Sequence, residues 1–80
     1  MDERSFRTLP LIDRVELLRK LGTYVGSRVH GGHQVHLYQL EGLHVELWMR
    51  LGLRQVEWAE VLRNTDILTE YVKLDLKDLL

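Results

Sequence analysis

Apolar and polar side chains alternate along the middle of the chain, in four runs that are separated by turns carrying glycine. The turns fall at Gly31-Gly32, Glu41-Gly42 and Leu51-Gly52. Alternation with a period of two predicts β-strands, and short turns between strands predict an antiparallel meander. The expected strands cover residues 23–30, 33–40, 43–50 and 53–61.

A helix is predicted before the first strand. Leu11, Val15 and Leu18 recur at i, i+4 and i+7, which places them on one apolar stripe. Thr8 is the expected N-cap, and Gly22 is expected to end the helix. The charged residues of this helix are expected to face outward: Asp13, Arg14, Glu16, Arg19 and Lys20.

A second apolar stripe, over residues 67–72, predicts a C-terminal helix capped by Asn64 or Thr65. The charged residues 1–7 are expected to form a frayed terminus. The pattern therefore predicts one α+β domain over residues 1–80, with an N-terminal helix, a four-stranded antiparallel β-meander and a C-terminal helix. Both helices are expected on one face of the sheet, in a two-layer sandwich.

The register of the strands decides which side chains share a face, because a slip of one residue sends a strand's apolar set to the other side. A two-residue turn at Glu41-Gly42 would place Leu37 opposite Glu46 and would separate the apolar sets of two strands. A three-residue turn pairs Leu37 with Val45, so we expect that turn, with another at residues 31–33 and a two-residue turn at 51–52. The predicted core face contains Val25, Val29, Val35, Leu37, Leu43, Val45, Leu47, Met49, Val56 and Trp58.

The opposite face of the predicted sheet is polar and aromatic. Large rings such as those of Tyr38 and Trp48 are seldom left wholly in water, and a small domain gains stability by burying a further face. We therefore expect a protein-interaction module that self-associates as a homodimer, or binds another protein, through this face or an edge of the sheet. The candidate interaction face consists of Tyr24, Arg28, His36, Tyr38, His44, Glu46, Trp48, Arg50 and Glu57.

Two other functions stay open. A small-ligand-binding protein or an enzyme could use His36, His44 and Glu46, with His36 as a general base oriented by Glu46. No serine, threonine or cysteine nucleophile is placed beside that pair, so we expect no enzyme. Aromatic rings with arginines could instead bind single-stranded nucleic acid, although Glu46 and Glu57 would repel its phosphates.

Composition narrows these alternatives. A net charge of −1 gives no overall attraction for nucleic acid or anionic lipid. The chain has no cysteine, which suits a reducing compartment, and we expect a cytoplasmic protein without a membrane span. Of the four histidines, His33 falls in the first predicted turn and His30, His36 and His44 fall in different rows of the predicted sheet, so no metal site and no cofactor are expected.

Four segments carry a resemblance: Gly22-Thr23-Tyr24-Val25, Leu37-Tyr38, Val45-Glu46-Leu47-Trp48 and residues 71–80. They resemble segments of a group of short bacterial proteins of similar length that carry no assigned function. The resemblance implies a free-standing bacterial domain, and it implies no catalytic residue or cofactor.

Overall fold

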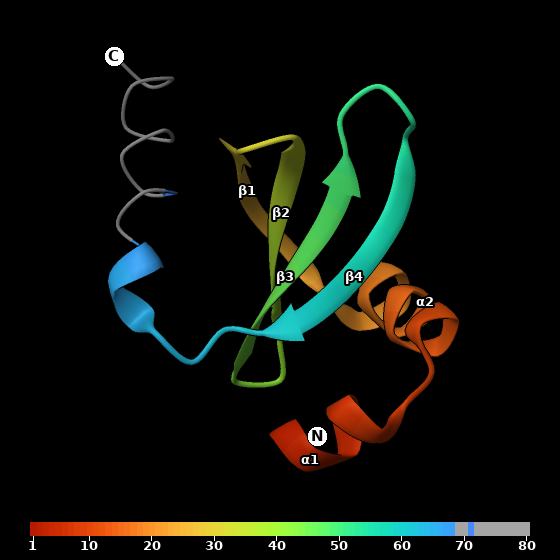
Figure 1. Ribbon diagram of the computed structural model, residues 1–80. Helices are drawn as coiled ribbons and strands as arrows, with labels where there is room; N and C mark the ends of the chain where they lie inside the picture. Colours follow the sequence, from red (N-terminus) through yellow and green to blue (C-terminus); the bar gives the residue numbers. More distant parts are fainter. Residues whose placement is uncertain (69–70, 72–80) are drawn as a thin grey trace.

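The computed structural model describes residues 1–68 and Tyr71. Its elements follow the order α1 (Glu3–Thr8), α2 (Leu11–Leu21), β1 (Thr23–His30), β2 (His33–Leu40), β3 (Leu43–Arg50), β4 (Gln55–Val61) and the 3-10 helix η1 (Thr65–Ile67). The strands form one antiparallel sheet in chain order, which confirms the predicted meander (Figure 1). The predicted C-terminal helix falls largely on residues 69–70 and 72–80, outside the described residues.

The expectation of a frayed N-terminus is wrong, because residues 3–8 form the helix α1. The Asp2 side chain caps this helix by accepting a hydrogen bond of 2.8 Å from the Ser5 backbone N–H. Phe6 is fully buried in the core beneath α1. One buried aromatic side chain therefore anchors a segment whose other residues are mostly charged.

Helix α2 begins two residues later than predicted, with Pro10 as its N-cap, because Thr8 belongs to α1. Gly22 ends α2 as predicted, but in extended rather than left-handed conformation, with φ −78° and ψ 150°. A Cβ atom at Gly22 would lie 2.6 Å from the Leu18 carbonyl oxygen. A larger residue at position 22 would therefore have to displace the Leu18 backbone, and glycine avoids this clash. None of the described helices is long and apolar enough to cross a membrane.

The predicted register of β2 and β3 is wrong. Leu40 pairs with Leu43 across a two-residue turn, so Leu37 lies opposite Glu46. Glu41 and Gly42 both have left-handed backbones, with φ +45° and +85°. Two such residues are typical of the type I′ hairpin turn, whose twist matches that of the strands it joins.

The other two turns also differ from the predictions. His30 pairs with His33 across a two-residue turn, which shifts β1 relative to the expected register. Arg50 pairs with Gln55, so residues 51–54 form a longer loop, and a β-bulge interrupts the pairing of β3 with β4 beside Trp48. Strand β4 consequently begins at Gln55 rather than at residue 53.

These turns give the sheet two apolar faces. On the helix face, Phe6 of α1 and Leu18 of α2 form one core with the strand residues Leu40, Val45, Leu47, Ala59 and Val61. The second face carries Val35, Leu37 and Tyr71, with Val25, Trp48, Leu62, Ile67 and Leu68 packed against them. Figure 1 shows α1 and α2 on one side of the sheet and η1 on the other. The expectation of a single core face is therefore wrong, and the predicted core residues Val29 and Trp58 are 66% and 46% exposed.

Candidate functional site

The nine residues of the predicted interaction face do not share one face. Tyr24, His36 and Tyr38 lie on the helix face, because His36 pairs with Leu47, Tyr38 pairs with Val45, and Tyr24 pairs with Tyr38. The remaining six lie on the second face: Arg28, His44, Glu46, Trp48, Arg50 and Glu57. The two-residue turn at Glu41-Gly42 causes this division. As a result the sheet separates His36 from Glu46, and the predicted general-base pair is absent from the described residues.

Glu46 is a buried carboxylate that is satisfied by two side chains of the second face. It is 5% exposed, and its Oε2 accepts hydrogen bonds from Arg28 Nη2 at 3.0 Å and from the Tyr71 hydroxyl at 2.8 Å. Arg28 Nε also donates to the Tyr71 oxygen at 3.1 Å. Burial, followed by the hydrogen bond to Glu46, raises the pKa of Tyr71 above its ordinary value. This triad fastens residue 71 to the sheet.

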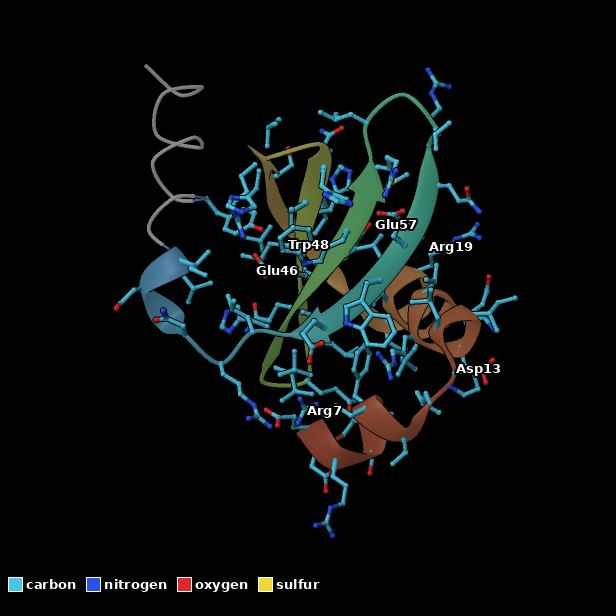
Figure 2. The ribbon with its side chains drawn as sticks, viewed as in Figure 1. Arg7, Asp13, Arg19, Glu46, Trp48 and Glu57 are labelled. Atoms are coloured by element: carbon cyan, nitrogen blue, oxygen red, sulfur yellow. The ribbon has the colours of Figure 1, made fainter. Side chains whose placement is uncertain are left out.

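Trp48 is enclosed by side chains of its own chain. The rings of His30 and His33 meet it edge-on, with centroids 5.9 and 5.6 Å away, and the Arg28 guanidinium lies 5.6 Å from its ring centroid. Glu46 and Trp48 extend from β3 on the side of the sheet that faces η1 (Figure 2). The Trp48 ring is thus part of the second core, which makes it a poor platform for stacking a nucleic-acid base.

Glu57 closes a polar network at the margin of the second face. Its carboxylate lies 2.5 Å from His33 Nε2 and 3.1 Å from Arg50 Nε. The hydrogen bond from His33, together with the nearby charge of Arg50, lowers the pKa of Glu57. Two of the predicted interaction residues, Arg50 and Glu57, therefore pair with each other.

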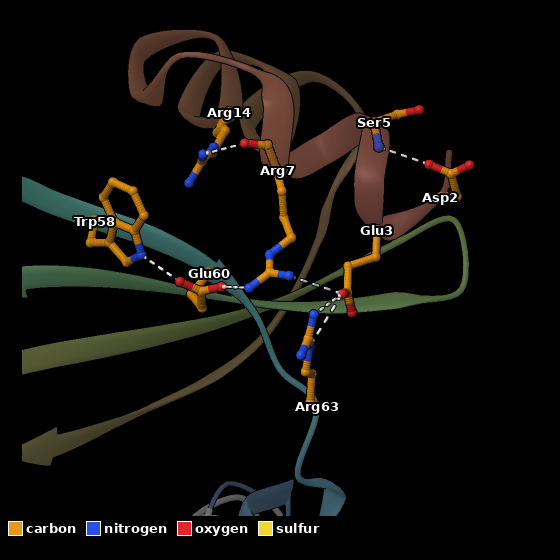
Figure 3. Close-up of polar contacts among 8 residues, drawn as sticks. All are labelled: Asp2, Glu3, Ser5, Arg7, Arg14, Trp58, Glu60 and Arg63. Carbon is orange, nitrogen blue, oxygen red and sulfur yellow. Dashed lines mark hydrogen bonds and ion pairs between the residues drawn. The ribbon is translucent and has the colours of Figure 1, made fainter.

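Arg14 and an ion-pair network attach the two helices to β4 (Figure 3). The Arg14 guanidinium donates to the carbonyls of Leu9, Ala59 and Arg7. The network links α1 to β4 and to the chain beyond it through Glu3–Arg63, Glu3–Arg7, Arg7–Glu60 and the bond from Trp58 Nε1 to Glu60. The hydrogen bond from Arg63 lowers the pKa of Glu3. The edge of the sheet at β4 is therefore occupied by contacts within the molecule.

The opposite edge of the sheet, at β1, is more open. Tyr24 and Val29 on β1 are 52% and 66% exposed. Backbone groups of an antiparallel pair point alternately toward and away from the partner strand. The backbone groups of His30 and His33, which flank the turn, point toward each other. By alternation along β1, the N–H and C=O groups of Val29 and Ser27 point away from β2. Among the described residues no strand pairs with this edge.

An open cavity of about 410 Å³ lies between the sheet and the loop that joins β3 to β4. It is lined by Gln34, His36, Met49, Arg50, Leu51, Gly52 and Arg54. The Tyr24 hydroxyl and His36 Nδ1 are 3.0 Å apart, and burial lowers the pKa of His36. The sequence pattern did not reveal Gln34 and Arg54 as site residues, because only the folded loop brings them beside His36.

Within the described part of the chain, no three His, Asp or Glu side chains are placed to hold a metal ion. Comparison of the chain with protein-family models, with curated proteins and with solved structures gives no match. Functional inference therefore rests on the geometry of the chain itself.

Proposed function

We propose that the protein is an interaction module that forms a homodimer through the edge strand β1. The observation that carries the proposal is the difference between the two edges of the sheet. Arg14 occupies a carbonyl of β4 at 2.8 Å, whereas Val29 of β1, whose backbone groups point outward, is 66% exposed. An edge with unpaired N–H and C=O groups is a template for another strand.

Pairing of β1 with its copy suits both the backbone and the side chains. A twofold axis lets the same edge serve both partners, so the sheet would continue across the interface through antiparallel pairing. On one side of that sheet the side chains of Val29 and Tyr24 would be removed from water. This burial would stabilise the dimer by roughly 25 cal/mol for each Å² of apolar surface buried. Of the two contacts expected from the sequence, the edge is better supported than the nine-residue face, because those nine residues lie on two faces.

A ligand-binding or catalytic role for His36, His44 and Glu46 has less support. His36 lies on the helix face, whereas His44 and Glu46 lie on the second face. Glu46 is already engaged by Arg28 and Tyr71. A reaction that needs His36 and Glu46 together has no shared site on this sheet.

Substitution of Val29 tests the proposed dimer. We expect the wild-type chain to elute with a mass twice its 9.5 kDa in size-exclusion chromatography with light scattering. Val29→Lys places a charge at the edge, which opposes strand pairing, so we expect a folded monomer at the same concentration.

Ile12→Lys is the matched control, because Ile12 is an exposed apolar residue of α2 at 73% exposure. This variant should remain a dimer. Circular dichroism of all three proteins checks that each is folded. A wild-type chain that is monomeric across the concentration range, or a Val29→Lys variant that stays dimeric, would contradict the proposal.

A further inference from the structure

The cavity beside the β3–β4 loop has the size and the chemistry of a small-ligand site. Its volume of about 410 Å³ lies at the lower end of the range for small-molecule pockets. Strand residues Gln34, His36 and Met49 form its floor, and residues 50–54 supply the rest of the lining. The loop lies at the end of the sheet away from α1, so the cavity is remote from that helix (Figure 1).

The polar groups that line the cavity favour a negative charge. Two arginines, one histidine and one glutamine line it, and its lining contains no carboxylate. Arg50 already pairs with Glu57 at 3.1 Å, whereas Arg54 makes no ion pair with any residue of the described chain. Arginine is the side chain best suited to hold a carboxylate or phosphate through two parallel hydrogen bonds.

His36 adds a directed donor. Its Nδ1 lies 3.0 Å from the Tyr24 hydroxyl. When that hydroxyl donates to Nδ1, the neutral imidazole carries its proton on Nε2, which then acts as a hydrogen-bond donor. Met49 and Leu51 supply apolar surface beside these donors, and Leu51 is 47% exposed.

The backbone of Arg54 has a conformation that glycine adopts more readily than arginine does. Arg54 has φ +51°, in the left-handed region where a side chain costs about 1 kcal/mol and glycine costs least. Arg54 thus brings a cation that has no ion-pair partner among the described residues to the lining of the cavity.

From these observations we propose that the cavity binds a small organic anion, whose charged group contacts Arg54 and His36 and whose apolar body packs on Met49 and Leu51. The anion site and the proposed homodimer share Tyr24, which lies on β1 and bonds to His36, but Val29, the residue substituted to test the dimer, does not line the cavity. Phosphate and carboxylate groups share this chemistry, so the experiment includes one probe of each kind.

The test is an NMR titration of the full chain with phenyl phosphate, with benzoate and with the neutral probe benzyl alcohol, at constant ionic strength. We expect saturable shifts of the Gly52 and Arg54 amides and of the His36 ring, with a Kd on the order of 1 mM for at least one anion. The rings of His30 and His44 do not line the cavity and serve as internal references.

Arg54→Gly separates binding from folding. It removes the cation and also relieves the left-handed strain, so we expect unchanged or higher stability together with at least about tenfold weaker anion binding. Arg54→Gln tests the loss of charge without the glycine, and Arg4→Gln is its control, because Arg4 is an exposed arginine of α1.

Three outcomes would overturn the anion site. They are the absence of saturable shifts at the cavity with either anion, equal binding of benzyl alcohol, and equal weakening by Arg4→Gln and Arg54→Gln. Arg54→Gly with wild-type affinity would equally exclude Arg54 as the contact. None of these outcomes bears on the dimer, which is tested by mass alone.

Discussion

Arg14 shows how a single charged residue can serve as a core residue. It is 8% exposed, and its guanidinium donates to three backbone carbonyls at 2.7 to 2.9 Å. Its charged group also stacks over the Trp58 ring, 4.7 Å from the centroid. Two of the carbonyls belong to Arg7 and Leu9 at the end of α1, so Arg14 satisfies groups that a helix end leaves without partners.

Replacement of Arg14 should destabilise the protein strongly. Arg14→Leu leaves the buried Ala59 carbonyl and two partly buried carbonyls without their donor, and we expect the free energy of unfolding to fall by about 2 to 4 kcal/mol. The stability of Arg14→Lys should lie between those of the wild type and Arg14→Leu, because an ammonium lacks the fork that reaches three carbonyls. Urea unfolding followed by tryptophan fluorescence measures both variants.

Arg19→Leu is the control for Arg14, because Arg19 lies on the same helix with its side chain 72% exposed. Its ion pair with Glu16 is on the surface, so we expect a change within about 0.5 kcal/mol. Equal effects at the two positions would show that the three carbonyl bonds contribute nothing. Helical periodicity predicted that both arginines face outward. Periodicity alone could not show that the chain before α2 and strand β4 bring carbonyl groups within reach of Arg14.

At the scale of elements, alternation predicted three strands with their observed bounds, whereas the pairing between strands was wrong. The residues of each strand do alternate between two faces. The predicted pairing assumed that the apolar residues of β2 and β3 lie on the same face, as in a sheet with one face in solvent. Here Val35 and Leu37 serve one core and Val45 and Leu47 serve the other. Gly42 could not decide between the two turns, since glycine suits both a two-residue type I′ turn and the left-handed position of a three-residue turn.

Gly42 therefore has a testable role in setting the register. Its φ of +85° suits glycine, and a Cβ atom there would meet nothing within 4 Å, so any cost of substitution is conformational. We expect Gly42→Ala to lower the free energy of unfolding by about 1 to 2 kcal/mol, because alanine is disfavoured in this region. Urea unfolding of the variant measures this cost.

Gly32→Ala is the matched control in the neighbouring turn. Gly32 also has open space where a Cβ atom would stand, and its backbone lies outside the left-handed region. Alanine there reduces the freedom of the unfolded chain, so we expect an unchanged or slightly higher stability. A Gly32→Ala variant as unstable as Gly42→Ala would show that something other than left-handed geometry sets the cost.

At the scale of the whole molecule, an 80-residue chain obtains two small cores by covering a single sheet from both sides. Segments from the two ends of the chain provide the covers, with Phe6 and Leu18 on the helix face and Ile67, Leu68 and Tyr71 on the second face. This arrangement removes the broad polar face on which our sequence-based interaction site depended. Among the described residues, the edge strand β1 and the cavity at the end of the sheet are both open, and neither follows from alternation alone.

Tyr71 connects the second cover to the sheet, and its ionisation should make stability depend on alkaline pH. Burial and the bond to Glu46 raise the pKa of Tyr71 in the folded state above the ordinary value of about 10. The folded protein then holds this proton more tightly than the unfolded chain does. The associated stability is complete below about pH 10 and declines as pH rises from there toward the folded-state value.

Tyr71→Phe should therefore lower the free energy of unfolding by roughly 1 to 3 kcal/mol at neutral pH, because Glu46 loses a buried donor. It should also weaken the decline in stability above pH 10, since the variant has no hydroxyl to ionise at this position. Urea unfolding at several alkaline pH values measures both effects, with Tyr38→Phe as the control on the helix face. If Tyr71→Phe kept the full alkaline decline of the wild type, Tyr71 would not be its source, and the predicted pH dependence would be refuted.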